Sequence, residues 1–270
     1  MKKYRGAVFF DIDGTLIPIR DRMTEEERKK LGTRHLSVPQ SAKDAIKKLN
    51  ENGYLTAIAS GRSEDYMYDL GIDISCVISA NGSVVRIDGK TVHTDVIEHS
   101  TATELTKYFT DNSLNYLIET EQGCFLGEGT DSDFVWAGKN YPPVSEYKGE
   151  RVEIGKIISY YDGRILEECE KRFGDKMVFL PHRYDTYMDI NQKGTSKASG
   201  IKKVLEIYGI DIADSYAFGD DLNDTEMLSA VGHAVVMTPH AAELEKVAEF
   251  ITDSVENDGI YKGLLHFGLI

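Results

Sequence analysis

A short apolar run near the start of the chain ends abruptly in two carboxylates, and this feature constrains the fold most. Residues 7–10 read Ala-Val-Phe-Phe, and Asp11 and Asp13 follow with one residue between them. The run predicts a buried strand, and the period of two along a strand places both carboxylates on one side. Open α/β sheets bind ligands beyond the carboxyl ends of their strands. The sequence therefore predicts an acidic site at one edge of a sheet.

Two carboxylates at one strand end repel each other unless a cation or a shared proton lies between them. Magnesium is the economical cation, because it takes oxygen ligands and is commonly held by one or two carboxylates together with a substrate phosphate. With its charge screened in this way, one of Asp11 and Asp13 can attack phosphorus while the other handles a proton. The plain alternative is an Asx-type turn, and the apolar run before Asp11 argues against it.

A second acidic segment follows another predicted strand. Residues 219–224 read Gly-Asp-Asp-Leu-Asn-Asp. An EF-hand calcium loop is excluded, because its alternating ligands and its distal Glu are absent. Asp220, the first residue after the strand, is the best candidate metal ligand, and Asn223 and Asp224 are candidates for orienting it and a phosphate. Whether Asp224 contacts the metal directly or only supports Asp220 stays open.

Other groups suit an anionic substrate. Ser60, Gly61 and Arg62 follow the second predicted strand and offer a hydroxyl and a backbone amide at the same edge. Arg62 either pairs with phosphate or caps a nearby helix. Lys197, at the start of a predicted helix, can neutralise both a nucleophilic carboxylate and an incoming phosphate. Lys193 is a rival for that role, and a solvated helix lysine is the plain alternative.

Composition narrows the class of protein. The chain has 270 residues, and 41% of them are hydrophobic, which is enough for a buried core. The formal net charge of -14 argues against a surface that binds nucleic acid or an anionic membrane, since such surfaces are basic. Three cysteines without metal-type spacing are expected to be buried, reduced thiols. The sequence shows neither a signal peptide nor a membrane span, so we expect a cytoplasmic location. The sequence does not indicate the oligomeric state.

Helices and strands alternate in two blocks that flank a different middle region. The alternation in each block predicts a parallel sheet with right-handed crossovers, and a hairpin with Asp88-Gly89 as its turn opens the middle region. We therefore predict an α/β fold: a Rossmann-like core formed by 1–82 and 188–270, with an α+β cap inserted at 83–187. The predicted strands are 7–10, 54–59, 76–79, 116–119, 156–161, 177–180, 186–190, 215–218, 233–237 and 250–251. The predicted helices are 39–52, a short one from Ser63, 101–111, 163–173, 196–208, one ending at Ala230, 240–247 and 259–267. A capping box at Thr101–Glu104 is predicted to open the helix 101–111.

In their order along the chain, these polar segments resemble the four motifs of the haloacid dehalogenase (HAD) superfamily of phosphohydrolases. The resemblance spans nearly the whole chain. An α+β insertion between the second and third motifs resembles the Cof-type subfamily, whose members are mostly small-molecule phosphatases, and so does the segment 78–82 at the first crossing. The matching segments are Asp11-Ile12-Asp13-Gly14-Thr15, Ser60-Gly61-Arg62, Lys197 and Gly219-Asp220-x-x-Asn223-Asp224.

The resemblance implies a role for each matching residue. Asp11 would be the nucleophile that forms an aspartyl-phosphate, and Asp13 the acid and base, with its main-chain carbonyl on the metal. Asp11 and Asp220 would supply side-chain ligands to Mg²⁺, and Asp224 belongs to the same metal-binding group. The residues that hold the phosphate would be Thr15, Ser60, Gly61, Arg62, Lys197 and Asn223.

The function implied by this resemblance is hydrolysis of a small phosphorylated metabolite, such as a sugar phosphate or a cofactor phosphate like pyridoxal phosphate or flavin mononucleotide. A phosphomutase or phosphotransferase that uses the same aspartyl-phosphate is one alternative. A phospho-receiver module without enzymatic activity is another, and Asp13 argues against it, because a receiver has little use for a general acid at that position.

Two segments depart from the family pattern. The link 17–38 is longer than usual, and its charged residues indicate a solvated loop, so the flap beside the active site is expected to differ. Residues 237–240 read Met-Thr-Pro-His where Met-Gly-Asn-Ala is usual, which puts a backbone role of that turn in doubt. Near the second crossing, His182, Arg183 and Tyr187 are candidates for contacting the organic part of the substrate, with exposed surface positions as the plain alternative.

Overall fold

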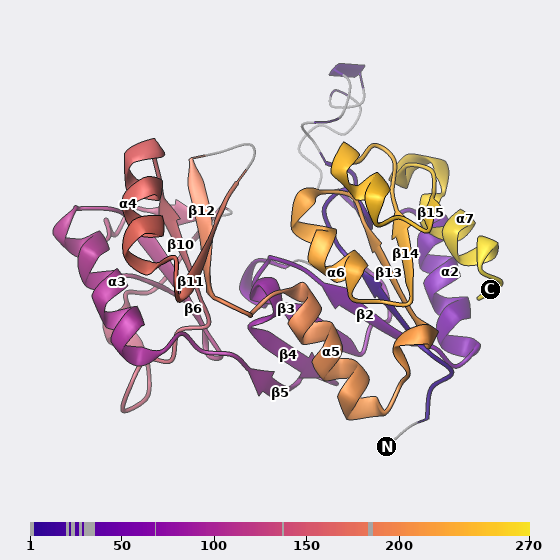
Figure 1. The fold of residues 1–270 in the computed structure, drawn as a ribbon, viewed down its shortest axis with the longest axis horizontal. Helices are drawn as coiled ribbons and strands as arrows, with labels where there is room; N and C mark the ends of the chain where they lie inside the picture. The colour runs from indigo at the N-terminus through magenta and orange to yellow at the C-terminus, as the bar shows by residue number, and fades with distance from the viewer. Residues whose placement is uncertain are drawn as a thin grey trace.

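The structure is a computed structural model that describes residues 3–19, 22, 25–26, 29, 36–67, 69–136, 138–182 and 186–270. It consists of two lobes, each built on its own sheet, and the chain crosses between them twice (Figure 1). The fold is mixed α/β with a central, mostly parallel sheet, as predicted. Within the described parts of the chain, no helix combines the length and the apolar character that crossing a membrane requires.

The larger sheet has β1 near its centre. Parallel pairing joins β1 to β2 and to β13, whereas β4 and β5 form an antiparallel hairpin at one edge. In spatial order the strands are β15 (Phe250–Ile251), β14 (His233–Val236), β13 (Ser215–Gly219), β1 (Ala7–Phe10), β2 (Leu55–Ala59), β3 (Cys76–Ser79), β4 (Val84–Ile87) and β5 (Lys90–Thr94).

Helices cover both faces of the larger sheet (Figure 1). Helices α2 (Gln40–Glu51) and α7 (Gly259–His266) share a buried apolar cluster with alternate residues of β1, and α5 (Lys197–Tyr208) and α6 (Thr225–Ser229) share the cluster on the other face. Because both faces are covered, every residue of β1 is buried. This arrangement explains why the strand is a continuous apolar run rather than an alternating one.

The smaller sheet is antiparallel, and helices α3 (His99–Asp111) and α4 (Gly163–Phe173) pack on one of its faces. Its strands in spatial order are β11 (Met177–Pro181), β12 (Tyr187–Gln192), β10 (Lys156–Tyr160), β6 (Tyr116–Thr120) and β7 (Gly123–Leu126). A short hairpin, β8 (Val135–Trp136) and β9 (Lys139–Asn140), packs on the other face through Phe134 and Trp136. The division of the chain into a core and a cap at residues 83 and 187 stays a prediction; the pairing of β4 with β3 puts the first hairpin of that segment in the larger sheet.

The main strands and helices predicted from the sequence are present, and the hairpin turn at Asp88-Gly89 is confirmed by positive φ at both residues. The predicted capping box at Thr101–Glu104 is wrong. Helix α3 begins at His99, and Thr101, inside its first turn, donates its hydroxyl back to the Glu98 carboxylate at 3.0 Å. A threonine followed three residues later by a glutamate is therefore part of the helix here, not its start.

Two predicted helices are only 3₁₀ turns. The helix expected from Ser63 is the turn Glu64–Tyr66, and the one expected at 240–247 is the turn Ala242–Lys246. Just before the second turn, the Ala241 amide donates to the Asp220 carbonyl at 3.0 Å. The three cysteines are buried and unpaired, as expected.

Candidate active site

The two acidic segments of the sequence, one after β1 and one after β13, lie at the same edge of the larger sheet. Strands β1 and β13 are parallel neighbours with Phe10 opposite Phe218, so their carboxyl ends coincide. The Asp11 amide continues this pairing by donating to the Phe218 carbonyl at 3.0 Å. Asp11 and Asp220 thus leave adjacent strands at one edge, as the sequence predicts.

Asp11, Asp220 and Asp224 form a buried group that we call the acidic edge. One carboxylate oxygen from each lies within 4.8 Å of the others. Burial raises the pKa of Asp11 well above its ordinary value; Lys197 opposes this shift, whereas the neighbouring acids add to it. Burial and then Asp224 raise the pKa of Asp220 to about 7, against the pull of Arg22. The acidic edge therefore carries more negative charge than its surroundings neutralise, and its hard oxygen donors fit a divalent cation such as Mg²⁺.

Lys197 brings a positive charge to the acidic edge. It is the first residue of α5, which begins after Ser196 in a reciprocal cap with Ser199. Its Nζ donates to Asp11 Oδ1 and to Asp224 Oδ1, both at 2.7 Å. Burial alone would lower the pKa of Lys197, but the two carboxylates outweigh it and raise the pKa above the ordinary value. The rival Lys193 lies elsewhere and donates to the Gly174 carbonyl at 3.2 Å.

Asp224 also shapes the loop that carries Asp220. Its Oδ2 accepts from the amides of Asp220 at 2.9 Å and Asp221 at 3.3 Å, while its Oδ1 accepts from Lys197. Both oxygens of this fully buried carboxylate are therefore engaged within the protein. Asn223, in the same loop, is exposed.

Asp13 is not part of the acidic edge, although it helps to raise the pKa of Asp11, and its carboxylate is held by Arg62. The Arg62 guanidinium donates from Nε to Asp13 Oδ2 at 2.8 Å and from Nη2 to Oδ1 at 2.6 Å. The Asp13 side chain is 44% exposed, so it faces solvent-accessible space. The sequence left a phosphate or a helix cap as partners for Arg62, and the structure adds the Asp13 carboxylate as a third.

The segment after β2 folds tightly against the first crossing between the lobes. Ser60 is buried, and its Oγ accepts from the Arg62 amide at 3.2 Å. A Cβ at Gly61 would lie 2.8 Å from Asn81 Oδ1, so a glycine allows this close approach. Thr15, also buried, donates its hydroxyl to Asp220 Oδ1 at 3.2 Å.

Comparison with known proteins assigns a family to this arrangement. A family model for haloacid dehalogenase-like hydrolases matches residues 8–264. The chain belongs to that family. The match includes all four segments that resemble HAD motifs and the middle region between them. Together with its relatives, it identifies the chain as a phosphatase of the HAD superfamily.

Relatives with full-length matches include named phosphatases. "Putative phosphatase YkrA" of Bacillus subtilis (strain 168) is 29% identical over 97% of this chain and 98% of its own length. The 5-amino-6-(5-phospho-D-ribitylamino)uracil phosphatase YcsE of the same organism is 25% identical over 97% and 95%. Among solved structures, the HAD phosphatase BT1666 from Bacteroides thetaiotaomicron is similar with a TM-score of 0.78 and 26% identity, covering 100% of this chain and 97% of that one.

Sequence reasoning missed a residue of this HAD site in the long link 17–38. Arg22 Nη1 donates to Asp220 Oδ2 at 2.5 Å and to the Pro239 carbonyl at 3.2 Å. The charged composition of the link predicts a solvated loop, and nothing in it distinguishes Arg22 from its neighbours. The arginine puts a second positive charge beside the acidic edge.

The candidate substrate contacts near the second crossing are only partly described. His182 Nε2 lies 3.0 Å from Asp189 Oδ1, and the Tyr187 ring packs edge-on against Trp136 with centroids 4.9 Å apart. Arg183 lies outside the described residues. Both described side chains are partly exposed and come from the smaller sheet or its margin.

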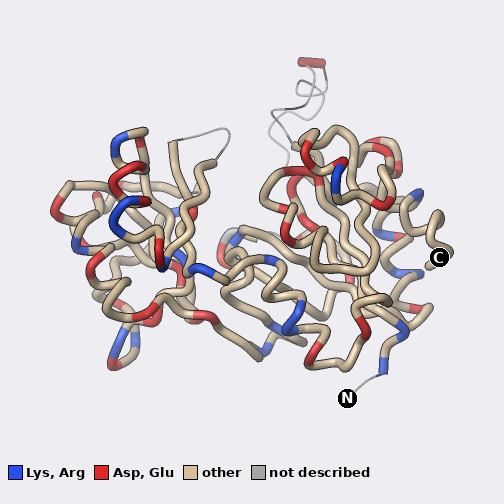
Figure 2. Tube along the Cα trace, viewed as in Figure 1, with Lys and Arg blue, Asp and Glu red and all other residues tan. Residues whose placement is uncertain are grey.

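Charged residues of both signs are dispersed over the two lobes (Figure 2). With 31 Lys and Arg against 45 Asp and Glu, the overall field repels an anionic substrate. Cations close to the acidic edge, including Lys197, Arg62 and Arg22, must therefore supply the local attraction.

Proposed function

We propose that the chain is a Mg²⁺-dependent phosphomonoesterase that hydrolyses small phosphorylated metabolites through an aspartyl-phosphate on Asp11. The observation that carries the proposal is the pair of 2.7 Å bonds from Lys197 to Asp11 and Asp224, at an edge that also holds Asp220. A buried carboxylate beside an ammonium group is poised to meet a second anion. Candidate substrates are sugar phosphates and cofactor phosphates such as pyridoxal phosphate or flavin mononucleotide.

Asp11 and Asp220 would hold the metal, together with the main-chain carbonyl of Asp13, and Asp224 lies in the same group. We assign Asp224 mainly to positioning, because its oxygens already accept from Lys197 and two amides. A bound Mg²⁺ supplies positive charge that screens the carboxylates and the phosphoryl oxygens from each other.

The protein groups divide the chemistry between them. Asp11 attacks phosphorus, and Lys197 stabilises the negative charge that gathers as nucleophile and phosphate approach. Asp13 protonates the leaving oxygen and then takes a proton from the water that hydrolyses the aspartyl-phosphate. Arg62 orients Asp13 through its two hydrogen bonds. The groups proposed to hold the phosphoryl oxygens are the Ser60 hydroxyl, the Gly61 amide, Lys197, Thr15 and Asn223, with Arg62 contributing charge nearby.

We further propose that residues 83–187 act as a cap over a core formed by 1–82 and 188–270. In this arrangement the core recognises the phosphoryl group, and the face of the smaller sheet that α3 and α4 leave uncovered contacts the organic part of the substrate. That face carries Trp136 and Tyr187 next to His182. Closure of such a cap excludes water from the reaction.

A panel of phosphorylated metabolites tests the function directly. It should include sugar phosphates, pyridoxal phosphate, flavin mononucleotide, the substrate named for YcsE and p-nitrophenyl phosphate, each assayed for released phosphate with Mg²⁺ and with a chelator. We expect multiple turnovers that stop when the metal is removed. Full activity in chelator would contradict the metal dependence. Transfer of phosphate to an added alcohol or sugar in preference to water would favour the phosphotransferase alternative.

A further inference from the structure

A buried lysine of the smaller sheet contacts the backbone of the larger lobe. Lys156, the first residue of β10, is 1% exposed. Its Nζ donates to the Gly61 carbonyl at 2.8 Å, across the boundary between the two sheets. A lysine is rarely buried so completely unless its charge is paired, and its hydrogen bonds show where it is directed.

Two acids of the smaller sheet neutralise Lys156. Asp189 Oδ2 lies 3.2 Å and Glu119 Oε1 3.4 Å from Nζ, and we call these three residues the Lys156 cluster. Burial would raise the pKa of Asp189, but Lys156 and His182 outweigh it and lower the pKa to about 2. Asn81 Nδ2 donates to Asp189 Oδ2 at 2.8 Å, which ties the cluster to the first crossing. The cluster thus places one lysine between two carboxylates and is anchored to both lobes.

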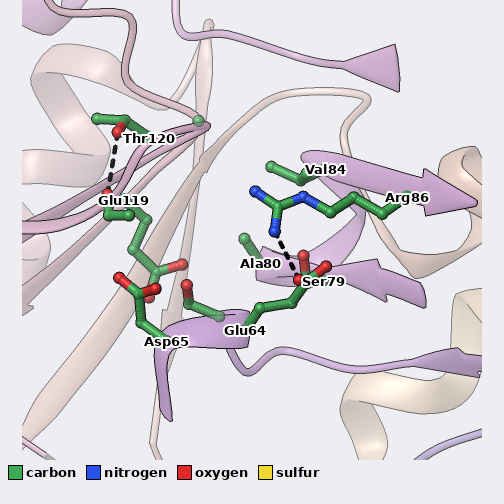
Figure 3. A pocket seen from close by; sticks show the side chains of 11 residues that line it. Glu64, Asp65, Ser79, Ala80, Val84, Arg86, Glu119 and Thr120 are labelled. Carbon is green, nitrogen blue, oxygen red and sulfur yellow. Dashed lines mark hydrogen bonds and ion pairs between the residues drawn. The ribbon is translucent and has the colours of Figure 1, made fainter. Parts of the chain in front are cut away.

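The surroundings of the Lys156 cluster leave little space for a substrate. A cavity of about 20 Å³, roughly the space for one water molecule, lies beside it and is lined by residues of both lobes. Figure 3 shows Glu119 in this cavity wall pointing from the smaller sheet toward Glu64 and Asp65. An organic substrate does not fit there, so the lysine has its effect through the groups that it contacts.

The Gly61 carbonyl belongs to the peptide unit that orients the phosphate-binding segment. The N–H of this unit is the Arg62 amide, which donates to Ser60 Oγ at 3.2 Å. The Arg62 side chain in turn holds Asp13 at 2.6 and 2.8 Å. A cation on the carbonyl polarises the peptide and fixes its plane, which strengthens the amide as a donor. Lys156 is therefore connected, through one peptide unit, to the Ser60 hydroxyl and to the group that orients Asp13.

We propose that Lys156 is a positioning residue for phosphoryl transfer, which sets the Gly61–Arg62 peptide so that Ser60 and Asp13 face the phosphoryl group. The proposal rests on the proposed phosphatase function. It makes the smaller lobe part of the catalytic arrangement even for a substrate too small to contact it. Lys156 does not touch the substrate.

Replacing Lys156 by Met removes the donor and retains the length of the side chain. We expect kcat to fall about 10- to 100-fold, because a small misplacement of catalytic groups has an effect of that order. The fall should be similar for p-nitrophenyl phosphate and for the best metabolite substrate, and KM should change little for either. The dissociation constant of Mg²⁺, measured by calorimetry, should stay at the wild-type value, because the acidic edge is untouched.

Glu119→Gln is the matched control. It removes one charge from the Lys156 cluster but leaves the bond from Lys156 to Gly61 in place, so kcat should stay close to that of the wild type. Lys156→Met leaves two buried acids without their cation, which can prevent folding. If it does, the triple variant Lys156→Met, Glu119→Gln and Asp189→Asn removes the buried charges together, and the same loss of kcat is expected. Thermal unfolding reports whether each variant is folded.

Three results would overturn the inference while leaving the proposed function intact. The first is an unchanged kcat in a folded variant that lacks Lys156. The second is a loss confined to the metabolite, which would place Lys156 in contact with the organic part of the substrate. The third is an equal loss in Glu119→Gln, which would show that only the integrity of the cluster matters. A wild-type protein that releases phosphate from no substrate would instead overturn the proposed function itself.

Discussion

The acidic edge of the larger sheet and the Lys156 cluster of the smaller sheet each surround a buried lysine. Lys197 is 2% exposed and Lys156 1%, and each is paired with two carboxylates. The two regions differ in how strongly the surroundings favour the ionised form of their carboxylates. Burial and neighbouring acids raise the pKa of Asp220 to about 7, whereas Lys156 and His182 hold the pKa of Asp189 down at about 2 despite its burial. The buried carboxylates Asp11 and Asp220 are disfavoured as anions, whereas Asp189 is stabilised as one.

This difference distinguishes carboxylates suited to reaction from a cluster suited to positioning its neighbours. A group of carboxylates that the protein does not neutralise is destabilising by itself and gains from binding a metal and reacting with an anion. A carboxylate that the protein already stabilises as an anion, such as Asp189, gains less from a metal and helps to fix the position of its neighbours. The short bonds of Lys197 end on a carboxylate proposed to react, whereas the shortest bond of Lys156 ends on a backbone carbonyl. Burial of a lysine alone does not distinguish the two roles; its acceptors do.

The largest expected effect is at Lys197. Lys197→Met should reduce turnover by about 10³-fold or more, since it removes the charge that stabilises nucleophile and phosphate together. Lys193→Met is the control and should behave like the wild type, because the Lys193 ammonium group donates to the Gly174 carbonyl and not to a residue of the acidic edge. Steady-state phosphate release measures both. If Lys193→Met has the greater effect, the third motif is assigned to the wrong lysine.

The second largest loss of activity is expected at Asp13. Arg62 holds its side chain, and Lys156 contacts the peptide unit that precedes Arg62. Asp13→Asn should lower kcat by roughly 10²–10⁴-fold, because general acid and base assistance is lost. The loss should be smaller for p-nitrophenyl phosphate than for an alkyl phosphate, since a good leaving group needs less protonation. Equal losses for both substrates would remove the acid role from Asp13.

A third comparison uses stability instead of activity. Asp189→Asn should lower the free energy of unfolding at pH 7 by about 2 kcal/mol, the equivalent of a pKa held near 2 instead of near 3.8. Because the pKa of the folded state is depressed, this stabilisation is present above about pH 4 and disappears as the pH falls toward 2. Denaturant unfolding of wild type and variant from pH 7 to pH 2 measures it.

Asp220→Asn is the counterpart at the acidic edge. It should abolish activity without lowering the free energy of unfolding measured in chelator, because it relieves repulsion between buried carboxylates. A marked loss of stability in Asp220→Asn, with none in Asp189→Asn, would reverse the comparison.

The smallest effect is expected at Arg22, which pairs with Asp220 from the long link. Arg22→Ala should tighten Mg²⁺ binding a few-fold, about 1 kcal/mol or less, because a partly exposed ion pair no longer competes for the carboxylate. Calorimetric titration with Mg²⁺ measures the dissociation constant. Weaker binding in the variant would show that the arginine supports the site instead of competing with the metal.

Much of this architecture could be predicted because the strongest signals are local. Asp11 and Asp220 each follow a buried strand directly, and parallel strands bring their carboxyl ends to one edge. The partners of Arg62, Lys156 and Arg22 could not be predicted, because they lie 49, 95 and 198 residues away in the sequence. A lysine that opens the mainly apolar strand 156–160 is the signal for the cluster that the sequence offers.

Two predictions made from local sequence patterns are wrong. The Thr101–Glu104 pattern matched a capping box, yet α3 starts two residues earlier, where Thr101 donates to Glu98. The pattern at 240–247 predicts a helix, but the segment forms a 3₁₀ turn after Ala241, whose amide donates to the Asp220 carbonyl. The first of these contacts is local, whereas the second joins separate segments of the chain and leaves no periodic pattern.

Chemical trapping of the phosphorylated enzyme tests the central claim, that Asp11 is the nucleophile at the acidic edge. The enzyme is mixed with substrate and Mg²⁺, quenched during turnover and reduced with borohydride, which converts an aspartyl-phosphate to homoserine; peptide mass spectrometry then locates it. We predict homoserine at position 11 and at no other aspartate, with none in Asp11→Asn. Homoserine at position 13 or 220, or phosphate release that continues in Asp11→Asn, would contradict the account.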